Sequence, residues 1–485
     1  MKQLFATKSV ADFHEMEATH ELQKALGAPA LVALGIGVII GTGIFVLTGI
    51  AAAQHAGPAL ILSLVLAGFG CALAGLCYAE FAAMIPVSGS AYSYSYATLG
   101  EAIAWFIGWN LILEYTVAPA TVAVGWSGYM TSLLAQIGLA LPATLTNAPL
   151  HIGAGHTLEF TGAIINLPAV AIVAIMTVLC YVGIRQSASF NNVIVIAKTI
   201  VVILFIAVGA FYVNPDNWVP FIPENTGSFG EFGWSGIAQA AGIIFFAYIG
   251  FDCVSTAALE AKNPQRDMPI GILVSLGLCT LLFVAVAAVL TGMVHYTDLN
   301  VPTPVALALD RHPELGWLSG CIKFGAIAGM TSVILVLMLG QARIFYAMSR
   351  DGLLPPLFGK VHPTFRTPHY STLITGACAG IVAGLFPINI LGEIVSIGTL
   401  LAFVTVCIGV LVLRYTRPEL HRPFRVSAPW LICPAGAIVC GGMMASLPVD
   451  TWWRLLIWTL LGLVVYVAYG YRHSALRRRI EAQAR

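Results

Sequence analysis

Residues 35–49 read Gly-Ile-Gly-Val-Ile-Ile-Gly-Thr-Gly-Ile-Phe-Val-Leu-Thr-Gly and lie inside a long apolar run. Each interior glycine costs a helix about 1 kcal/mol relative to alanine. We therefore expect a helix over residues 30–54 that is unwound at Gly41-Thr42-Gly43. Backbone groups freed in this way are tolerated in a membrane only where they line a cavity or bind a ligand. The alternative is close packing through small residues, which membrane helices also use.

The composition of the whole chain indicates a membrane protein. Of its 485 residues, 59% are hydrophobic and 9% are charged, and the mean hydropathy is +0.88. A soluble globular chain carries about 25% charged residues. The surface of a soluble protein of this size could not be covered with so few charges. Disordered chains, nucleic-acid-binding proteins and ordinary soluble enzymes are all disfavoured.

Hydropathy predicts an all-α membrane protein with twelve spans. A spanning helix needs about 20 mostly apolar residues, and the alternating pattern of a membrane β-barrel is absent. The expected spans are residues 30–54, 58–84, 101–132, 165–184, 190–213, 233–258, 269–293, 316–345, 371–389, 391–413, 430–447 and 452–471. Residues 1–29 are polar and do not resemble a cleavable signal peptide.

The positive charges predict the orientation. With a cytoplasmic N-terminus, Arg311 and Arg454 fall on the outer side, and Lys198 and Lys323 fall inside spans. All the other members of the set of 23 Lys and Arg residues fall on the cytoplasmic side, as the positive-inside rule requires. Both termini are then cytoplasmic, and the expected location is the plasma (inner) membrane.

A second interruption is expected in the sixth span, at Phe245-Phe246-Ala247-Tyr248-Ile249-Gly250-Phe251-Asp252. The alternative is ordinary packing of an aromatic patch, with Asp252 near a helix end. The two interruptions each open a unit of five spans. This layout is typical of inverted-repeat transporters, which bind substrate between two discontinuous helices near the bilayer midplane.

Several motifs in this order resemble the amino acid–polyamine–organocation transporters, and among them the cationic amino acid transporter subfamily. The matching stretches are residues 35–45, 56–59, 77–80, 86–94, 246–252, 260–264 and 343–355. The resemblance implies a LeuT-like fold of five plus five helices with two further C-terminal helices. The expected parts are the cytoplasmic segment 1–29, a first repeat 30–213, an outer loop 214–232, a second repeat 233–414, a cytoplasmic loop 415–429, two spans over 430–471 and a cytoplasmic tail 472–485.

An α-amino acid could be held by backbone groups at the two interruptions. A helix that begins after the first interruption presents free N–H groups and a positive dipole end, which suit a carboxylate. Thr42, Gly43 and Ile44 are the candidate donors. For the ammonium group, the family resemblance implies carbonyl acceptors at Ile40, Phe246, Ala247 and Ile249.

The substrate side chain is expected to meet apolar residues, with Met330 as the candidate in the eighth span. A methionine offers no charge partner, so a pocket lined by Met330 favours small neutral amino acids over arginine or lysine. This departs from the subfamily name, so a cationic substrate stays open as an alternative. Ordinary core packing of Met330 is the other reading.

Lys198 is the candidate coupling residue. It lies about 12 Å into the fifth span, where burial disfavours its charged form and allows a proton to load and leave. In the bacterial relatives, a lysine at this position marks proton-coupled members. The alternatives are that Lys198 snorkels to the headgroups, or that the protein exchanges amino acids without a proton.

The remaining charged residues in the spans carry weaker hypotheses. Glu114 and Asp252 are candidates for gating or proton transfer, Glu80 lies near the cytoplasmic face, and Lys323 is expected to snorkel. We expect no catalytic group, metal site or cofactor, because the cysteines and histidines form no metal-ligand or catalytic spacing. The expected partners are an L-amino acid, a proton and membrane lipids, and not a nucleic acid. A passive channel is a less suitable alternative, because rings of pore-lining charge are absent.

Overall fold

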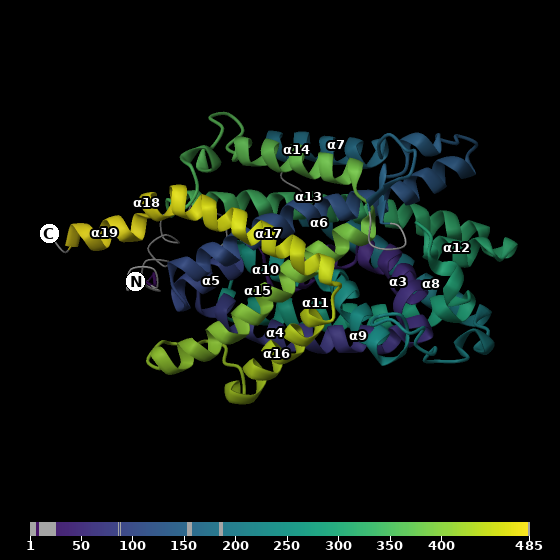
Figure 1. The fold of residues 1–485 in the computed structure, drawn as a ribbon, viewed down its shortest axis with the longest axis horizontal. Coiled ribbons are helices and arrows are strands. Elements are labelled where there is room, and N and C mark those ends of the chain that lie inside the picture. Colours follow the sequence, from purple (N-terminus) through teal and green to yellow (C-terminus); the bar gives the residue numbers. More distant parts are fainter. Residues whose placement is uncertain are drawn as a thin grey trace.

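Two long helices are interrupted halfway along, and this feature organises the computed structural model (Figure 1). The structure describes residues 6–8, 26–85, 87, 89–152, 158–183 and 188–483. Most of the predicted N-terminal segment, Pro86 and Ser88 of one motif, Arg185 and the last two residues lie outside this described part.

In the described part of the first half, the structure has fifteen elements. In order these are α2 (Ala28–Ile39), the π-helical turn Gly43–Leu47, α3 (Thr48–Ala51), the π-helical turn Ala52–Ala56, the 3-10 turn Gly57–Ala59, α4 (Leu60–Met84), α5 (Ser90–Thr98), α6 (Glu101–Gln136), the 3-10 turn Ala143–Leu145, β1 (Leu150–Ile152), β2 (Leu158–Phe160), α7 (Leu167–Val182), α8 (Ala188–Gly209), and the 3-10 turns Ala210–Tyr212 and Pro215–Trp218.

The second half follows the same pattern of an interrupted helix and four further long helices, and then adds a C-terminal hairpin. In order the elements are α9 (Gly233–Ile244), the 3-10 turn Phe245–Tyr248, α10 (Phe251–Thr256), the 3-10 turn Ala258–Glu260, α11 (Pro264–Met293), the 3-10 turn Tyr296–Leu299, α12 (Pro304–Asp310), the 3-10 turn Pro313–Leu315, α13 (Gly316–Arg350), the 3-10 turn Pro356–Gly359, α14 (His369–Leu385), α15 (Ile388–Thr416), α16 (Pro429–Ala445), α17 (Val449–Val465), the π-helical turn Tyr466–Gly470, α18 (Tyr471–His473) and α19 (Ala475–Gln483).

The helices are long and apolar enough to cross a membrane. Among the described residues, eight helical stretches meet this standard by length and composition, and four shorter apolar helices accompany them. Each of the twelve runs expected from hydropathy falls on helix over most of its length. The helices are therefore those of a polytopic all-helical membrane protein.

The packing separates a central group of helices from a supporting group. In the centre, α11 packs on α2 and α4, while α4 also contacts α9. Around it, α6 packs along α13, and α14 lies beside α7 at one edge of the bundle (Figure 1). The interrupted helices thus lie inside the bundle, where backbone groups are shielded from lipid.

Some elements were not foreseen from the sequence. A short antiparallel hairpin pairs β1 with β2 in the register Leu150↔Phe160, and α5, α12 and α19 are short helices beside the long ones. Residues Ala6–Lys8 and α19 lie at one end of the bundle, which we call the terminus end. The opposite end carries α12 (Figure 1).

The terminus end is tied together by ion pairs, one of them buried and one partly exposed. Lys8 Nζ lies 2.7 Å from Asp351 Oδ1, and Tyr92 donates to Asp351 Oδ2 at 2.7 Å. Arg343 Nη2 lies 3.0 Å from Glu260 Oε1. Hydrogen bonds between Leu26 and the chain at residues 260–262 join the beginning of the first interrupted helix to the end of the second.

Two charged residues of the spans have structural partners. Glu80 accepts from Arg414 Nε at 2.9 Å and from Arg414 Nη2 at 2.7 Å, which fastens α4 to α15. Lys323 Nζ lies 3.0 Å from Asp310 Oδ2 and is only 2% exposed. The expectation that Lys323 snorkels is wrong, because a carboxylate from α12 lies within reach.

Candidate binding site between two interrupted helices

The first interruption separates α2 from the helix that resumes at Gly43. Ile40 has an extended backbone (φ −75°, ψ 93°), and Thr42 precedes the π-helical turn without capping it through its side chain. The last carbonyls of α2 and the first amides after Thr42 therefore lack the usual intrahelical partners. The interruption covers Ile40 and Gly41, and Thr42 already has helical dihedral angles, so the break begins one residue before the expected joint at residues 41–43.

The second interruption lies between the 3-10 turn Phe245–Tyr248 and α10. Ile249 is extended (φ −61°, ψ 132°), and Gly250 has φ 125°. A side chain at this φ is strained. A Cβ on Gly250 would also lie 2.5 Å from Val38 Cγ1, so glycine is required here for two reasons.

The two interruptions touch. A Cβ on Gly43 would lie 2.3 Å from Ala247 Cα, which means that the two backbones meet with no side chain between them. Gly41 lies against α13, where its Cβ would be 3.3 Å from Val333 Cγ2. The glycines of residues 35–43 therefore permit close approach at the place where both helices are open.

A small cavity of about 10 Å³ lies at this contact. It has room for about one water molecule, so an amino acid could enter only if the walls separated. The first interrupted helix, α6 and α13 contribute residues with small or aliphatic side chains, and the second interruption contributes one aromatic and one aliphatic residue. The lining residues are Val38, Ile39, Gly41, Thr42, Gly43, Ala118, Val122, Phe246, Ile249, Val333 and Leu337.

The cavity contains some of the predicted site residues and adds others. Thr42, Gly43, Phe246 and Ile249 line it, while Ile40, Ile44 and Ala247 are buried beside it in the same two segments. Ala118, Val122, Val333 and Leu337 were not predicted. These are ordinary aliphatic residues of long helices, and no local pattern distinguishes them from core residues.

Met330 occupies a different place from the one expected. It is fully buried and does not line the cavity. Its Sδ lies 3.1 Å from Thr42 Oγ1, and the same hydroxyl lies 3.3 Å from the carbonyl oxygen of Val122. Met330 thus supports the side chain of Thr42 from behind.

Lys198 projects from α8 to the first interruption. Its Nζ donates to the carbonyl oxygen of Gly37 and, at 3.0 Å, to that of Ile40. The side chain is 1% exposed, and Gly329 of α13 lies against its stem. An ammonium group at the carbonyl end of a helix is favoured both by hydrogen bonding and by the helix dipole. The ammonium therefore points at the interruption and does not snorkel.

The two candidate carboxyl groups lie near this site on different helices. Tyr115 donates to Asp252 Oδ2 at 2.8 Å, and the amide of Gly250 donates to Asp252 Oδ1 at 3.1 Å. Within the described part of the chain, neither oxygen of the buried Glu114 has a hydrogen-bond partner. An ionised carboxylate without a hydrogen-bond partner is costly in a buried position.

A larger cavity opens at the end of the bundle opposite the termini. Its volume is about 520 Å³, and its walls include Val46, Ile50, Gly125 and Thr303. Gly125 also adjoins the site, because a Cβ there would lie 2.6 Å from Thr42 Cγ2. The wall of this cavity therefore reaches a residue that packs against Thr42 of the first interruption, whereas ion pairs join segments at the terminus end.

The described residues offer no metal site. Within the ranges that the structure covers, no group of three or more His, Cys, Asp and Glu side chains could hold a metal ion. The polar groups at the interruptions are backbone amides, backbone carbonyls, the Thr42 hydroxyl, the Lys198 ammonium and the Asp252 carboxyl group, which accepts from the Gly250 amide. These groups can bind a small zwitterion.

Comparison with known proteins agrees with this geometry. Residues 26–468 match the model of the amino acid permease family. The chain is 47% identical over 478 residues to the methylthioribose transporter of Bacillus subtilis (strain 168), which covers 99% of this chain and 100% of the relative. It is 46% identical over 477 residues to the branched-chain amino acid permease BcaP of the same strain, covering 98% and 99%.

A plant relative is more distant. The chain is 37% identical over 421 residues to the vacuolar cationic amino acid transporter 4 of Arabidopsis thaliana, covering 86% of this chain and 68% of the relative. These relatives are named as transporters or permeases and not as enzymes. The chain therefore belongs to the amino acid permease family and is a multi-pass membrane protein.

Proposed function

We propose that this chain is a secondary active transporter that takes up L-amino acids with small neutral side chains, such as alanine, together with a proton. One observation carries the proposal. The two interrupted helices touch at Gly43 and Ala247, and no charged side chain lines the cavity between them. Backbone amides and carbonyls without intrahelical partners at such a contact suit the carboxylate and the ammonium group of an amino acid.

The headgroup would be bound by the helix ends. The helix that resumes at Gly43 presents its N-terminal amides, which suit the substrate carboxylate. The carbonyl ends at Ile40 and around Phe246 suit the ammonium group. Because backbone atoms supply both partners, the site needs neither an acidic nor a basic side chain for the headgroup.

The lining favours an uncharged substrate side chain. Ala118, Val122, Val333 and Leu337 offer only apolar surface. A lysine or arginine side chain buried here would lose its hydration without gaining a charged partner, which costs free energy. The name of BcaP supports an aliphatic amino acid, whereas the names of the plant relatives support the cationic alternative.

The coupling proposal rests on Lys198. Its ammonium group donates to the Ile40 carbonyl oxygen, which is also a proposed acceptor for the substrate ammonium. A carbonyl oxygen has two lone pairs and can accept from both groups. Loss of the proton from Lys198 would then change the hydrogen bonding of the Ile40 carbonyl oxygen, to which the substrate ammonium group is proposed to bind. Glu114 and Asp252 are proposed to assist in gating or proton transfer.

We extend the proposal to the topology. Twelve spans would form a LeuT-like fold, with repeats over residues 30–213 and 233–414 and two further helices over 430–471. The charge distribution supports cytoplasmic termini in the plasma (inner) membrane. The cavity of about 520 Å³ would then face outwards, and the ion pairs at Asp351 and Glu260 would close the cytoplasmic side.

A second candidate substrate follows from one relative. The methylthioribose transporter is 47% identical over the full chain. A neutral sugar with a methylthio group would also suit a cavity without charged side chains. The amino acid remains the preferred substrate, because the open helix ends match a carboxylate and an ammonium group.

Uptake into proteoliposomes tests the proposal. Radiolabelled L-alanine uptake should be inhibited by excess alanine, serine or valine and little affected by arginine, lysine or methylthioribose. Strong inhibition by arginine, with none by alanine, would establish the cationic alternative. Inhibition by methylthioribose alone would establish the sugar. If counterflow of alanine occurs without a pH gradient, and an imposed pH gradient does not change alanine uptake, the protein exchanges amino acids without a proton.

A further inference from the structure

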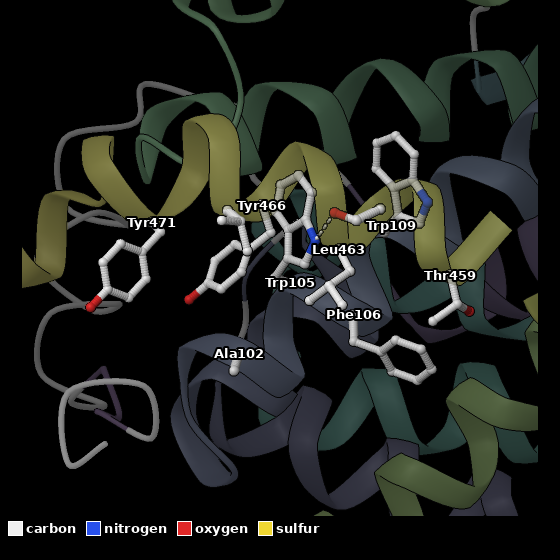
Figure 2. Close-up of a pocket in the computed structure, with 10 residues that line it drawn as sticks. Ala102, Trp105, Phe106, Trp109, Thr459, Leu463, Tyr466 and Tyr471 are labelled. Atoms are coloured by element: carbon white, nitrogen blue, oxygen red, sulfur yellow. Dashed lines mark hydrogen bonds between the residues drawn. The ribbon is translucent and has the colours of Figure 1, made fainter. Parts of the chain in front are cut away.

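A groove separate from the transport site opens on the side of the bundle between α6 and α17 (Figure 2). Its volume is about 490 Å³, which lies within the range of about 300–1,000 Å³ typical of small-ligand sites. The lining includes Trp105, Phe106 and Trp109 from α6 and Gly462, Leu463 and Tyr466 from the other wall. Leu463 is 54% exposed, so the groove opens outwards from the bundle and not into its core.

A continuous row of aromatic rings, contributed by both sides, runs along the groove. The ring of Tyr471 is followed by those of Tyr466, Trp105, Trp109 and Trp458, with neighbouring centroids 4.6–6.3 Å apart. Figure 2 shows the first four of these side chains along the groove. The first ring, that of Tyr471, is perpendicular to its neighbour, and the other four are stacked at interplanar angles of 18–27°.

Hydrogen bonds between α6 and α17 hold the tryptophan rings of this row in place. Trp109 Nε1 donates to the carbonyl oxygen of Trp458 at 2.8 Å, and Trp458 Nε1 donates back to that of Trp109 at 3.0 Å. Trp105 Nε1 donates to the Gly462 carbonyl oxygen at 3.0 Å. A Cβ on Gly462 would lie 2.3 Å from Trp109 Cδ1. The indoles are thus locked to the opposite helix, which leaves a preformed groove beside them.

The groove ends at Tyr471, beside an arginine-rich stretch of the chain at the terminus end. Tyr471 forms that end of the lining, and the guanidinium carbon of Arg477 lies 3.7 Å from the centre of its ring. Arg477 is buried and also donates to Glu101, which balances its charge. Arg472 and Arg478, next in the chain to these two residues, are exposed. The proposed orientation places this region at the cytoplasmic surface of the membrane.

We infer that the groove is a binding site for an anionic phospholipid of the cytoplasmic leaflet. One acyl chain would lie along the aromatic row between α6 and α17, and the headgroup phosphate would lie at Arg472 and Arg478. The apolar groove suits a hydrocarbon chain, and the two exposed guanidinium groups suit a phosphate. The inference rests on the proposed orientation but not on the identity of the transported substrate.

Native mass spectrometry of the full-length protein in a mild detergent tests the inference. Dioleoyl phosphatidylglycerol and dioleoyl phosphatidylcholine, which share their acyl chains, are added separately. We expect the phosphatidylglycerol adduct to exceed the phosphatidylcholine adduct by about fivefold or more, since each nearby cation adds to anionic lipid binding.

Two variants separate the parts of the site. Ala102→Phe places a ring in the groove and should remove the adduct, whereas Ala174→Phe, on an exposed position of α7, should leave it unchanged. Arg472→Gln combined with Arg478→Gln leaves the groove intact and should make the two lipids bind equally. This double variant changes only exposed side chains, so it keeps the test valid if Ala102→Phe fails to fold.

Three results would overturn the inference. The first is equal binding of the two lipids by the unaltered protein. The second is a phosphatidylglycerol adduct that survives in folded Ala102→Phe or keeps its preference in the double arginine variant. The third is a dimer of the chain in place of lipid-bound monomer, which would assign the groove to a second copy.

Discussion

Lys198 Nζ lies 3.0 Å from the carbonyl oxygen of Ile40, the residue at which the first interrupted helix opens. The lysine is on α8 and the carbonyl belongs to the carboxyl-terminal end of α2, so this hydrogen bond joins two spans at the proposed substrate site. In the proposed mechanism, a proton gained or lost by Lys198 would change this hydrogen bond at the interruption.

Removal of Lys198 should uncouple transport from the proton gradient. In proteoliposomes, a proton gradient should no longer raise the alanine accumulated by Lys198→Ala above the level reached without a gradient. The reason is that the ammonium group bound to the Gly37 and Ile40 carbonyls has been removed. Lys323→Ala is the matched control, since Lys323 is also buried in a span but pairs with Asp310. Gradient-driven accumulation by Lys198→Ala would refute the coupling role.

Gly43→Ala should block transport by separating the two interruptions. Its new methyl group would lie 2.3 Å from Ala247 Cα. Overpacking of this kind costs about 1–3 kcal/mol, which corresponds to a loss of about tenfold or more in substrate affinity. Initial uptake rates over a range of alanine concentrations measure the effect.

A glycine elsewhere in the membrane provides the control for this variant. A Cβ on Gly277 of α11 would meet nothing within 4 Å. Gly277→Ala should therefore keep full uptake, and the helix should gain slightly from alanine's higher propensity. Normal alanine affinity in Gly43→Ala would show that close contact of the two interruptions is dispensable.

Val333→Ala should enlarge the pocket and change substrate selectivity. Val333 lines the cavity and lies against Gly41. Removal of two methyl groups should raise leucine uptake relative to alanine uptake by about tenfold, the scale on which hydrophobic pockets discriminate side chains. Val336→Ala, on the same helix but outside the lining, should keep the original ratio. An unchanged ratio in Val333→Ala would exclude α13 from the side-chain pocket.

Asp351→Asn should open the terminus end more often. The carboxylate holds Lys8 and Tyr92, and hydrogen bonds to a charged group contribute about 1.5–3 kcal/mol each. We expect faster alkylation of the buried Cys253 by a water-soluble maleimide, measured on the Cys253 peptide by mass spectrometry. Alkylation of the exposed Cys378 should not change and is the internal control. An unchanged rate at Cys253 would show that Asp351 does not hold this end closed.

The sequence contains enough information to locate the helices and both interruptions. Long apolar runs and the glycines at 35–43 and 250 are local signals, and local signals set helix boundaries and breaks. Lys198 was also identifiable, because a lone cation deep in an apolar run has few structural reasons to be there. Its hydrogen bond to Ile40 lies across two spans and could not be inferred from spacing.

The walls of the cavity could not be predicted in the same way. Val122 and Val333 look like other valines of apolar helices, and only the packing of α6 against α13 brings them to the interruptions. The prediction for Lys323 was wrong for a similar reason. Asp310 lies on a short helix that hydropathy did not reveal, and the two side chains meet only in the folded chain.

The most direct test of the account measures substrate and proton together. Proteoliposomes that hold a trapped pH-sensitive dye receive external L-alanine without an imposed gradient. If alanine and a proton enter together, alanine should acidify the interior of liposomes that contain the unaltered protein, whereas Lys198→Ala should give no acidification. Entry of alanine with no change in internal pH, or no entry of alanine at all, would contradict it.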